Sequence, residues 1–261
     1  MADGYDPGFL VTTLPLPAPR QAVRTLTYPR FAVLLDPERR LAAATAVNID
    51  GRTMRDLPRE GDWHLDSRVP EGEQTGPEVY AGNDLDRGHL VRRRDPGWGE
   101  PDAARAAMSA TFVYPNAAPQ AAGFNQSKEL WLGLEDHVLA YAESTDQRLS
   151  VFTGPVLSDD DPVYRGIRIP LRFWKIAAWS GDAGLACAGF VLDQSALIDV
   201  SEGRLAAPPL GAFHTFQVPV SAIADMTGVD LGALVDADVL RGRALRGEAW
   251  PELTEAGDIL L

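Results

Sequence analysis

Cysteine and positive charge are both scarce in this sequence. Among 261 residues there is one cysteine, Cys187, so an internal disulfide framework and a cysteine-rich zinc site are excluded. Because it lies in an apolar run, we expect a buried and unreactive thiol. Lysine and arginine number 24 against 37 acidic residues, a formal net charge of -13. This balance argues against coating nucleic acid through the overall field, although a local basic groove is compatible with it.

Long apolar runs are missing as well. No run approaches the roughly 20 residues that span a bilayer, and residues 1–7 lack the basic and then apolar layout of a signal peptide. For the sequence as written we expect no membrane partner and a cytoplasmic location, with export by another route or origin in a larger protein left open. The composition is that of a globular protein, 45% hydrophobic and 23% charged.

Hydrophobic patterning predicts an antiparallel sheet early in the chain. Residues 1–28 are rich in proline, leucine and alanine, and we expect an arm that packs in extended form. Two strands are predicted next, at 31–35 and 41–49, joined by a turn. From 51 to 80 the apolar content falls and arginines alternate with proline and glycine, which indicates an irregular surface segment with a functional role.

The second half of the chain predicts one long helix and further strands. Apolar residues at helical spacing indicate a helix over 127–144 that Ser127 can cap, and residues 103–114 are expected to be a connection. A strand is predicted at 149–157, and a hairpin at 173–180 and 185–192. The tail from 222 shows helix-like pieces without recognisable chemistry.

The most informative stretch is Asp86-Arg87-Gly88-His89. If it is extended, Arg87 and His89 point to one face, and Gly88 leaves room for close approach to the backbone. The planar guanidinium of arginine suits a phosphate, and the near-neutral pKa of histidine suits proton transfer. The pair is therefore compatible with phosphodiester hydrolysis. A turn with a surface ion pair is the alternative that these four residues alone leave open.

Together with downstream motifs, this stretch resembles the DNA/RNA non-specific endonucleases, a ββα-metal family. The matching residues cover roughly positions 30–220 and are Asp86-Arg87-Gly88-His89, Asn116 with Pro119-Gln120, Asn125, Trp131 with Leu134-Glu135, Phe152-Thr153-Gly154-Pro155 and Phe173-Trp174-Lys175. The resemblance implies an α+β fold in which a central antiparallel sheet carries a metal-binding helix and flanking helices. The expected divisions are an arm at 1–28, the endonuclease domain at 29–220 and a helical extension of the same domain at 221–261.

The resemblance also implies roles for individual residues. His89 would be the general base that activates water, and Asn125 would be the only protein ligand of a divalent metal, Mg²⁺ with Mn²⁺ as a substitute. Glu135 would hold metal-bound waters, although taken by itself it could be a solvated acid on the helix. Arg87 would line the site, and Arg59 is preferred to Arg55 as the upstream phosphate clamp. Six positions separate Asn125 from Trp131, where many relatives have four, so the geometry of Glu135 is less defined.

Two further groups of residues are expected near the site. The run from Arg87 to Arg94 holds four arginines and no acid, which predicts a basic strip that contacts substrate, joined by a lysine in an apolar strand; these substrate contacts are Arg92, Arg93, Arg94 and Lys175. The supporting residues are Asp86, Asn116, Gln120 and Trp131, with Asn116 and Gln120 ordering the loop that leads into the helix.

The leading interpretation is an enzyme that cleaves DNA and RNA with little sequence preference. Two alternatives stay open: an enzyme narrowed to another phosphodiester, and a catalytically inactive relative that binds nucleic acid. A non-specific nuclease without a signal peptide would threaten its own cell, so an inhibitor or a carrier protein is an expected partner. A homodimer is also compatible with the sequence.

Overall fold

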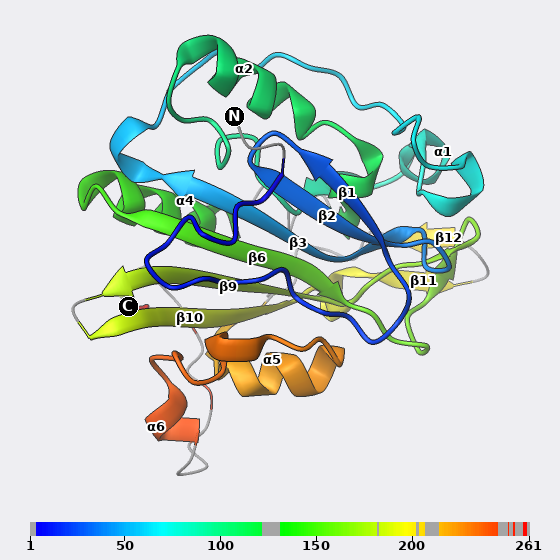
Figure 1. The fold of residues 1–261 in the computed structure, drawn as a ribbon. Coiled ribbons are helices and arrows are strands. Elements are labelled where there is room, and N and C mark those ends of the chain that lie inside the picture. The colour runs from blue at the N-terminus through cyan, green and yellow to red at the C-terminus, as the bar shows by residue number, and fades with distance from the viewer. Residues whose placement is uncertain are drawn as a thin grey trace.

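The computed structural model describes residues 4–121, 131–181, 183–201, 204–206, 214–244, 250, 253 and 258–259. Its centre is an antiparallel sheet of seven strands in the order β1-β2-β3-β6-β9-β10-β13 (Figure 1). These strands are β1 Arg24–Tyr28, β2 Phe31–Asp36, β3 Leu41–Asp50, β6 Arg148–Val156, β9 Arg172–Gly181, β10 Gly184–Asp193 and β13 His214–Val218.

Three two-stranded sheets and a small set of helices surround this sheet. The pairs are β4 Leu85–His89 with β5 Ala117–Ala121, β7 Val163–Tyr164 with β8 Ile167–Arg168, and β11 Asp199–Ser201 with β12 Arg204–Ala206. The helices are α1 Pro77–Tyr80, α2 Pro101–Ala110, α4 Trp131–Ser144, α5 Val220–Thr227 and α6 Arg241–Ala244. In the described part of the chain, no helix combines the length and apolar character of a membrane span.

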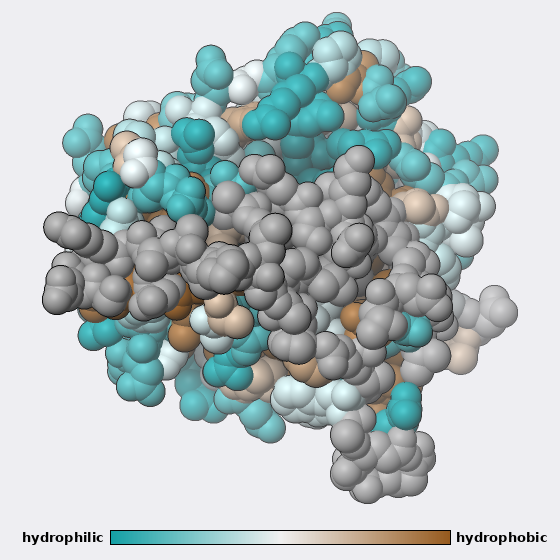
Figure 2. Space-filling view, turned by 180° about the vertical axis from the view of Figure 1, so that it is seen from behind, coloured by the Kyte–Doolittle hydropathy of each residue, from teal (hydrophilic) through white to brown (hydrophobic). Residues whose placement is uncertain are grey.

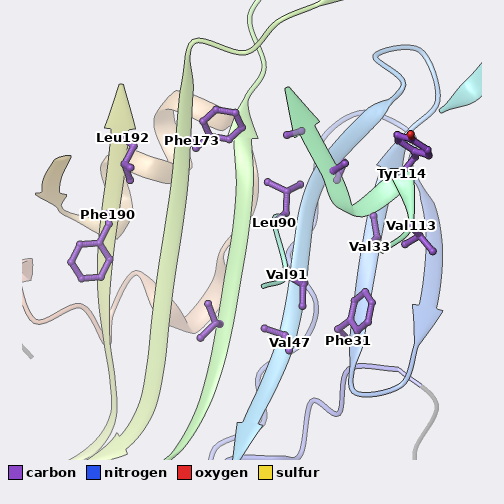
Figure 3. Close-up of a cluster of buried hydrophobic side chains, with 14 of the residues drawn as sticks. Phe31, Val33, Val47, Leu90, Val91, Val113, Tyr114, Phe173, Phe190 and Leu192 are labelled. Carbon is purple, nitrogen blue, oxygen red and sulfur yellow. The ribbon is translucent and has the colours of Figure 1, made fainter. Parts of the chain in front are cut away.

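The central sheet is covered on both faces. Side chains alternate along β2, so Phe31 and Val33 join one buried cluster while Ala32 and Leu34 join the other. One face packs against the N-terminal arm and α5, which appears below the sheet in Figure 1. The opposite face packs against α1, α4 and the β4–β5 pair, and Figure 3 shows its side chains pointing toward one another. The Asp86-Arg87-Gly88-His89 motif therefore lies in the layer over this second face.

The expected strands are confirmed. Strands β2 and β3 pair antiparallel, and β9 and β10 form the predicted hairpin with Gly181 opposite Gly184. The predicted helix is confirmed over Trp131–Ser144, while its expected beginning at Ser127 lies outside the described residues. Cys187 is a buried thiol whose Sγ lies 3.1 Å from the Leu234 carbonyl oxygen, and burial raises its pKa, in agreement with an inert role.

Several elements were not predicted, and β1 and α2 are two of them. The arm ends in β1, which pairs with β2 at the edge of the main sheet. The stretch expected to be a connection contains α2, which begins with Pro101, a residue suited to the first helical turn. Its buried face consists of Ala104, Ala107 and Met108, and such small side chains give a weak periodic signal. Hydrophilic side chains predominate at the end of the molecule that carries α2, at the top of Figure 2.

Candidate active site

The Asp86-Arg87-Gly88-His89 motif lies in one strand of a short ribbon. Strand β4 pairs antiparallel with β5, so that His89 lies opposite Ala117 and Gly88 opposite Ala118. The stretch is thus extended, which is the condition under which Arg87 and His89 share a face. A Cβ atom on Gly88 would lie 2.1 Å from the side-chain Cδ of Gln120, so only glycine fits without displacing that side chain.

Two asparagine side chains fix the ends of β4. Before the strand, Asn83 donates to the Val79 carbonyl oxygen at 2.6 Å and accepts from the Leu85 N–H at 3.0 Å. After the strand, the fully buried Asn116 accepts from the Val91 N–H and donates to the Val91 and Thr111 carbonyl oxygens, each at 2.9 Å. Asn116 therefore has a structural role, and the segment that it orders is the exit from β4.

The imidazole of His89 is enclosed by aromatic rings. Its centroid lies 4.4 Å from that of Trp63 and 5.0 Å from that of Phe112, the latter in an edge-to-face arrangement. Trp63 is held there because the neighbouring residue His64 exchanges backbone hydrogen bonds with Phe112 and Tyr114. The sequence placed Trp63 among the loop arginines but gave no sign that it contacts His89.

The environment of His89 favours a neutral ring. The side chain is half-buried, and its Nε2 atom is buried without a hydrogen-bond partner among the described residues. Burial, followed by the positive charges of Arg59, Arg93 and Arg92, lowers the His89 pKa to about 3. His89 is therefore unprotonated at neutral pH, the state in which it can accept a proton.

The structure distinguishes the two candidate phosphate clamps. Arg59 is exposed, and its guanidinium lies 5.3 Å from the ring centroid of Phe112, beside His89. Arg55 instead donates from Nε to the Gly99 carbonyl oxygen at 2.7 Å. Arg87 is exposed, and its charge counteracts the rise that burial causes in the pKa of Tyr80. The geometry favours Arg59 over Arg55.

Replacing Arg59 with glutamine is expected to raise the His89 pKa, because one of the positive charges that disfavour imidazolium is removed. The Arg55→Gln variant is the matched control, since Arg55 is not among the charges that act on His89. NMR titration of the imidazole measures both. An equal shift in the two variants would contradict the placement of Arg59.

The lowered pKa of His89 predicts the direction in which stability changes with pH. Between about pH 3 and pH 6.5 the unfolded chain protonates His89 while the folded chain does not, so the unfolded state binds more protons. The contribution of His89 to the free energy of unfolding is therefore expected to fall as the pH is lowered through 6.5. Urea titrations of wild type and His89→Ala at several pH values measure it: the free energy of unfolding of wild type minus that of the variant should decrease as the pH is lowered from about 7 toward 3.

The expected basic strip, Arg92, Arg93 and Arg94, is half-buried, and each of its residues makes a hydrogen bond or an ion pair with another part of the protein. Arg93 donates from Nη1 to the Leu57 carbonyl oxygen at 3.1 Å, and so supports the loop that carries Arg59. Arg94 pairs with Glu143 of α4 at 3.1 Å. The backbone N–H of Arg92 donates to Asp95 Oδ2 at 3.1 Å. The charges of Arg92 and Arg93 act on the His89 pKa, and Arg93 also supports the loop that precedes Arg59.

The remaining candidates have interior positions. Lys175 is 2% exposed in the middle of β9, opposite Thr153 and Phe190, so it lies inside the protein rather than on an exposed surface. Its role as a substrate contact stays a prediction. Asp86 is half-buried opposite Gln120. The Gln120 side chain is fully buried, and within the described part of the chain neither its Nε2 nor its Oε1 has a hydrogen-bond partner.

The metal assignment rests on residues that the structure covers only in part. Asn125 lies outside the described residues, and Glu135 and Trp131 are placed in α4 without their side chains. Within the described ranges, no three His, Cys, Asp or Glu side chains gather into a metal-binding group. The buried Gln120 amide next to Gly88 has an oxygen and a nitrogen without hydrogen-bond partners among the described residues. These two atoms fit a hydrated cation, because they can hydrogen-bond to the water molecules that surround the ion.

Comparisons with known proteins agree with this geometry. A family model described as DNA/RNA non-specific endonuclease matches residues 14–238. The uncharacterized protein y4fB of Sinorhizobium fredii is 39% identical over 94% of this chain, which spans 42% of that protein's length. The crystal structure of the EndoG/EndoGI complex matches with a TM-score of 0.59 and 19% identity, over 78% of this chain and 84% of that chain. This likeness shows an α+β fold of the ββα-metal nuclease type.

Proposed function

Because the chain belongs to the DNA/RNA non-specific endonuclease family, we propose that it is a divalent-metal-dependent nuclease that hydrolyses phosphodiester bonds of DNA and RNA. The observation that carries this proposal is a neutral histidine set among arginines at the end of β4. The histidine supplies a proton acceptor, and the arginines supply positive charge for the phosphate. An enzyme narrowed to another phosphodiester has no specific observation in its favour.

In the proposed mechanism, His89 takes a proton from the attacking water. A pKa of about 3 in the free protein makes a weak base, but an approaching phosphate offsets the charges of Arg59, Arg92 and Arg93. The His89 pKa therefore rises as substrate binds, so that His89 is a stronger base in the complex with substrate than in the free protein. Trp63 and Phe112 restrict the imidazole to one orientation, which lowers the entropy cost of reaching the reactive geometry.

Arg59 and Arg87 are proposed to bind the phosphate oxygens. Both are exposed, and each planar guanidinium can donate two parallel hydrogen bonds. Asn125 would hold the Mg²⁺ ion, or Mn²⁺ in its place, and Glu135 would orient its waters. When bound, the metal stabilises negative charge on the phosphate and on the leaving oxygen.

Digestion of plasmid DNA and of total RNA, each with and without EDTA, tests the proposal. We expect both polymers to be cut, and EDTA to stop both reactions. Cleavage of a cyclic dinucleotide alone would instead identify an enzyme narrowed to another phosphodiester. Binding of both polymers without cleavage at any divalent metal concentration would identify an inactive relative.

If the basic strip of Arg92, Arg93 and Arg94 contacts phosphates, the affinity for substrate should depend on salt concentration. Replacing Arg92, Arg93 and Arg94 together with glutamine is expected to raise KM more than it lowers kcat. It should also flatten the slope of log affinity against log salt by about one to three units, since each lost phosphate contact removes about 0.9 units for duplex DNA. Measuring KM and affinity at several salt concentrations gives both quantities.

A second triple variant controls for the change in net charge. Arg24, Arg148 and Arg241 are each paired with an acid on other parts of the surface, at Glu73, Asp50 and Asp236. Their replacement by glutamine removes the same charge and is expected to leave the slope unchanged. Equal slopes for the strip variant and wild type, with stability reduced, would show that the strip is structural.

Inhibitory or carrier partners are proposed on biological grounds. The similar solved structure is a complex of EndoG with EndoGI that concerns the mechanism of EndoG inhibition, and a non-specific nuclease endangers the cell that makes it. An inhibitor of this chain would be expected to cover Arg59 and His89. A homodimer is a separate proposal, which sedimentation analysis can test.

A further inference from the structure

One buried glutamine joins the catalytic ribbon to the main sheet. Gln194 is 0% exposed, and its side-chain Oε1 accepts from the Ala121 N–H at 3.0 Å. Its Nε2 donates to the Pro119 carbonyl oxygen at 3.2 Å and to the Pro170 carbonyl oxygen at 2.7 Å. The amide thus uses its acceptor and both donors on backbone groups, two of which belong to β5.

The backbone of Gln194 is itself fixed to the main sheet. It follows the last residue of β10, and its N–H donates to the Leu171 carbonyl oxygen at 2.9 Å, next to the start of β9. The side chain therefore projects from a rigid position where β9 begins and β10 ends. Any movement of β5 away from this point would leave three buried polar groups unpaired, which is costly.

The ribbon has a particular need for such a tether. Among the described strands, β4 and β5 pair only with each other and form no ladder with the seven-stranded sheet. An isolated two-stranded ribbon is marginally stable. Pro119 has no N–H, so the edge of β5 that faces away from β4 offers only a carbonyl oxygen at this position, and that oxygen is the group that Gln194 binds. The hydrogen bonds from Gln194 give β5 a directional link to the main sheet, which packing of apolar side chains does not supply.

We propose that Gln194 is a positioning residue for catalysis: through Pro119 and Ala121 it fixes β5, and through β5 it fixes His89 on β4. The inference rests on the proposed nuclease function. Gln194 touches no reacting atom, so its loss should lower turnover without removing the general base. The same tether fixes Ala121, the last described residue before the segment that carries Asn125.

The chain offers a matched control in Gln74. It is 1% exposed, and its side chain also accepts from one backbone N–H, that of Asp66, and donates to two carbonyl oxygens, those of Asp66 and Val69. These bonds close a local loop rather than join the ribbon to the sheet. Gln194→Met and Gln74→Met therefore remove the same three kinds of hydrogen bond at similar side-chain volume.

We expect both variants to lower the urea midpoint of unfolding to a similar extent. Only Gln194→Met should lower kcat, by about 10- to 100-fold as for other residues that orient a catalytic group, with KM little changed. Hydrogen exchange supplies a readout independent of activity: the amides of Gly88 and Ala121 should exchange faster in Gln194→Met and at the wild-type rate in Gln74→Met.

The outcomes separate the inference from the function on which it rests. Wild-type kcat and wild-type exchange in a folded Gln194→Met would overturn the positioning role, while loss of activity in His89→Ala would still support the nuclease. If Gln194→Met does not fold, Gln194→Glu keeps the acceptor for Ala121 but sets a carboxylate against two carbonyl oxygens. A folded Gln194→Glu with full kcat would likewise overturn the inference.

Discussion

Replacing His89 with alanine is expected to lower turnover by about 10²- to 10⁴-fold, the usual range for loss of a general base. The residue is the only histidine placed in the ribbon beside the arginines, and its ring is neutral at pH 7 because burial and their charges lower its pKa. Digestion rates under single-turnover conditions measure the loss, because product release then does not mask the chemical step.

The His89→Ala substitution should leave folding and metal binding nearly intact. Calorimetric titration with Mg²⁺ and the midpoint of thermal unfolding check these two properties. His64→Ala is the matched control, since His64 is exposed and its Nδ1 lies 3.0 Å from its own loop's Asp62 carbonyl oxygen. If His89→Ala instead loses its affinity for metal, His89 is a ligand and the proposed proton transfer is wrong.

Replacing Asn125 with alanine is expected to abolish activity at ordinary Mg²⁺ concentrations. The family resemblance assigns this amide as the only protein ligand, and the part of the chain that the structure describes contains no acidic or histidine cluster to replace it. Mg²⁺ keeps most of its waters and is held by few protein groups, so losing one ligand is severe. Calorimetry with Mg²⁺ and the digestion assay should fail together.

Two other substitutions serve as comparisons for Asn125→Ala. Glu135→Gln is expected to be milder, about 10- to 100-fold, because it alters the orientation of metal-bound water. Asn116→Ala removes an amide with three backbone hydrogen bonds and should lower stability by about 1–3 kcal/mol while metal binding persists. Normal digestion by Asn125→Ala would remove the metal assignment altogether.

The sequence alone determined the elements whose signals are local. The short, nearly continuous apolar runs of β2 and β3 mark strands, and the apolar spacing of 131–144 marks a helix. The order of short motifs identified the family, whereas the sequence left open whether Asp86 to His89 is a strand or a turn. These features depend on residues close together in the chain, so they can be deduced before the fold is known.

Only the tertiary structure decided what surrounds His89. Trp63 precedes it by 26 positions, and Gln194 bonds to residues 73 and 75 positions earlier in the chain. No periodicity links such positions, because their contact depends on how the whole sheet places loops from different strands. The same reason explains Lys175, which the sequence offered as a substrate contact and the fold buries. A strand pattern tells which side chains share a face, but the layers packed on that face determine whether it meets solvent, substrate or core.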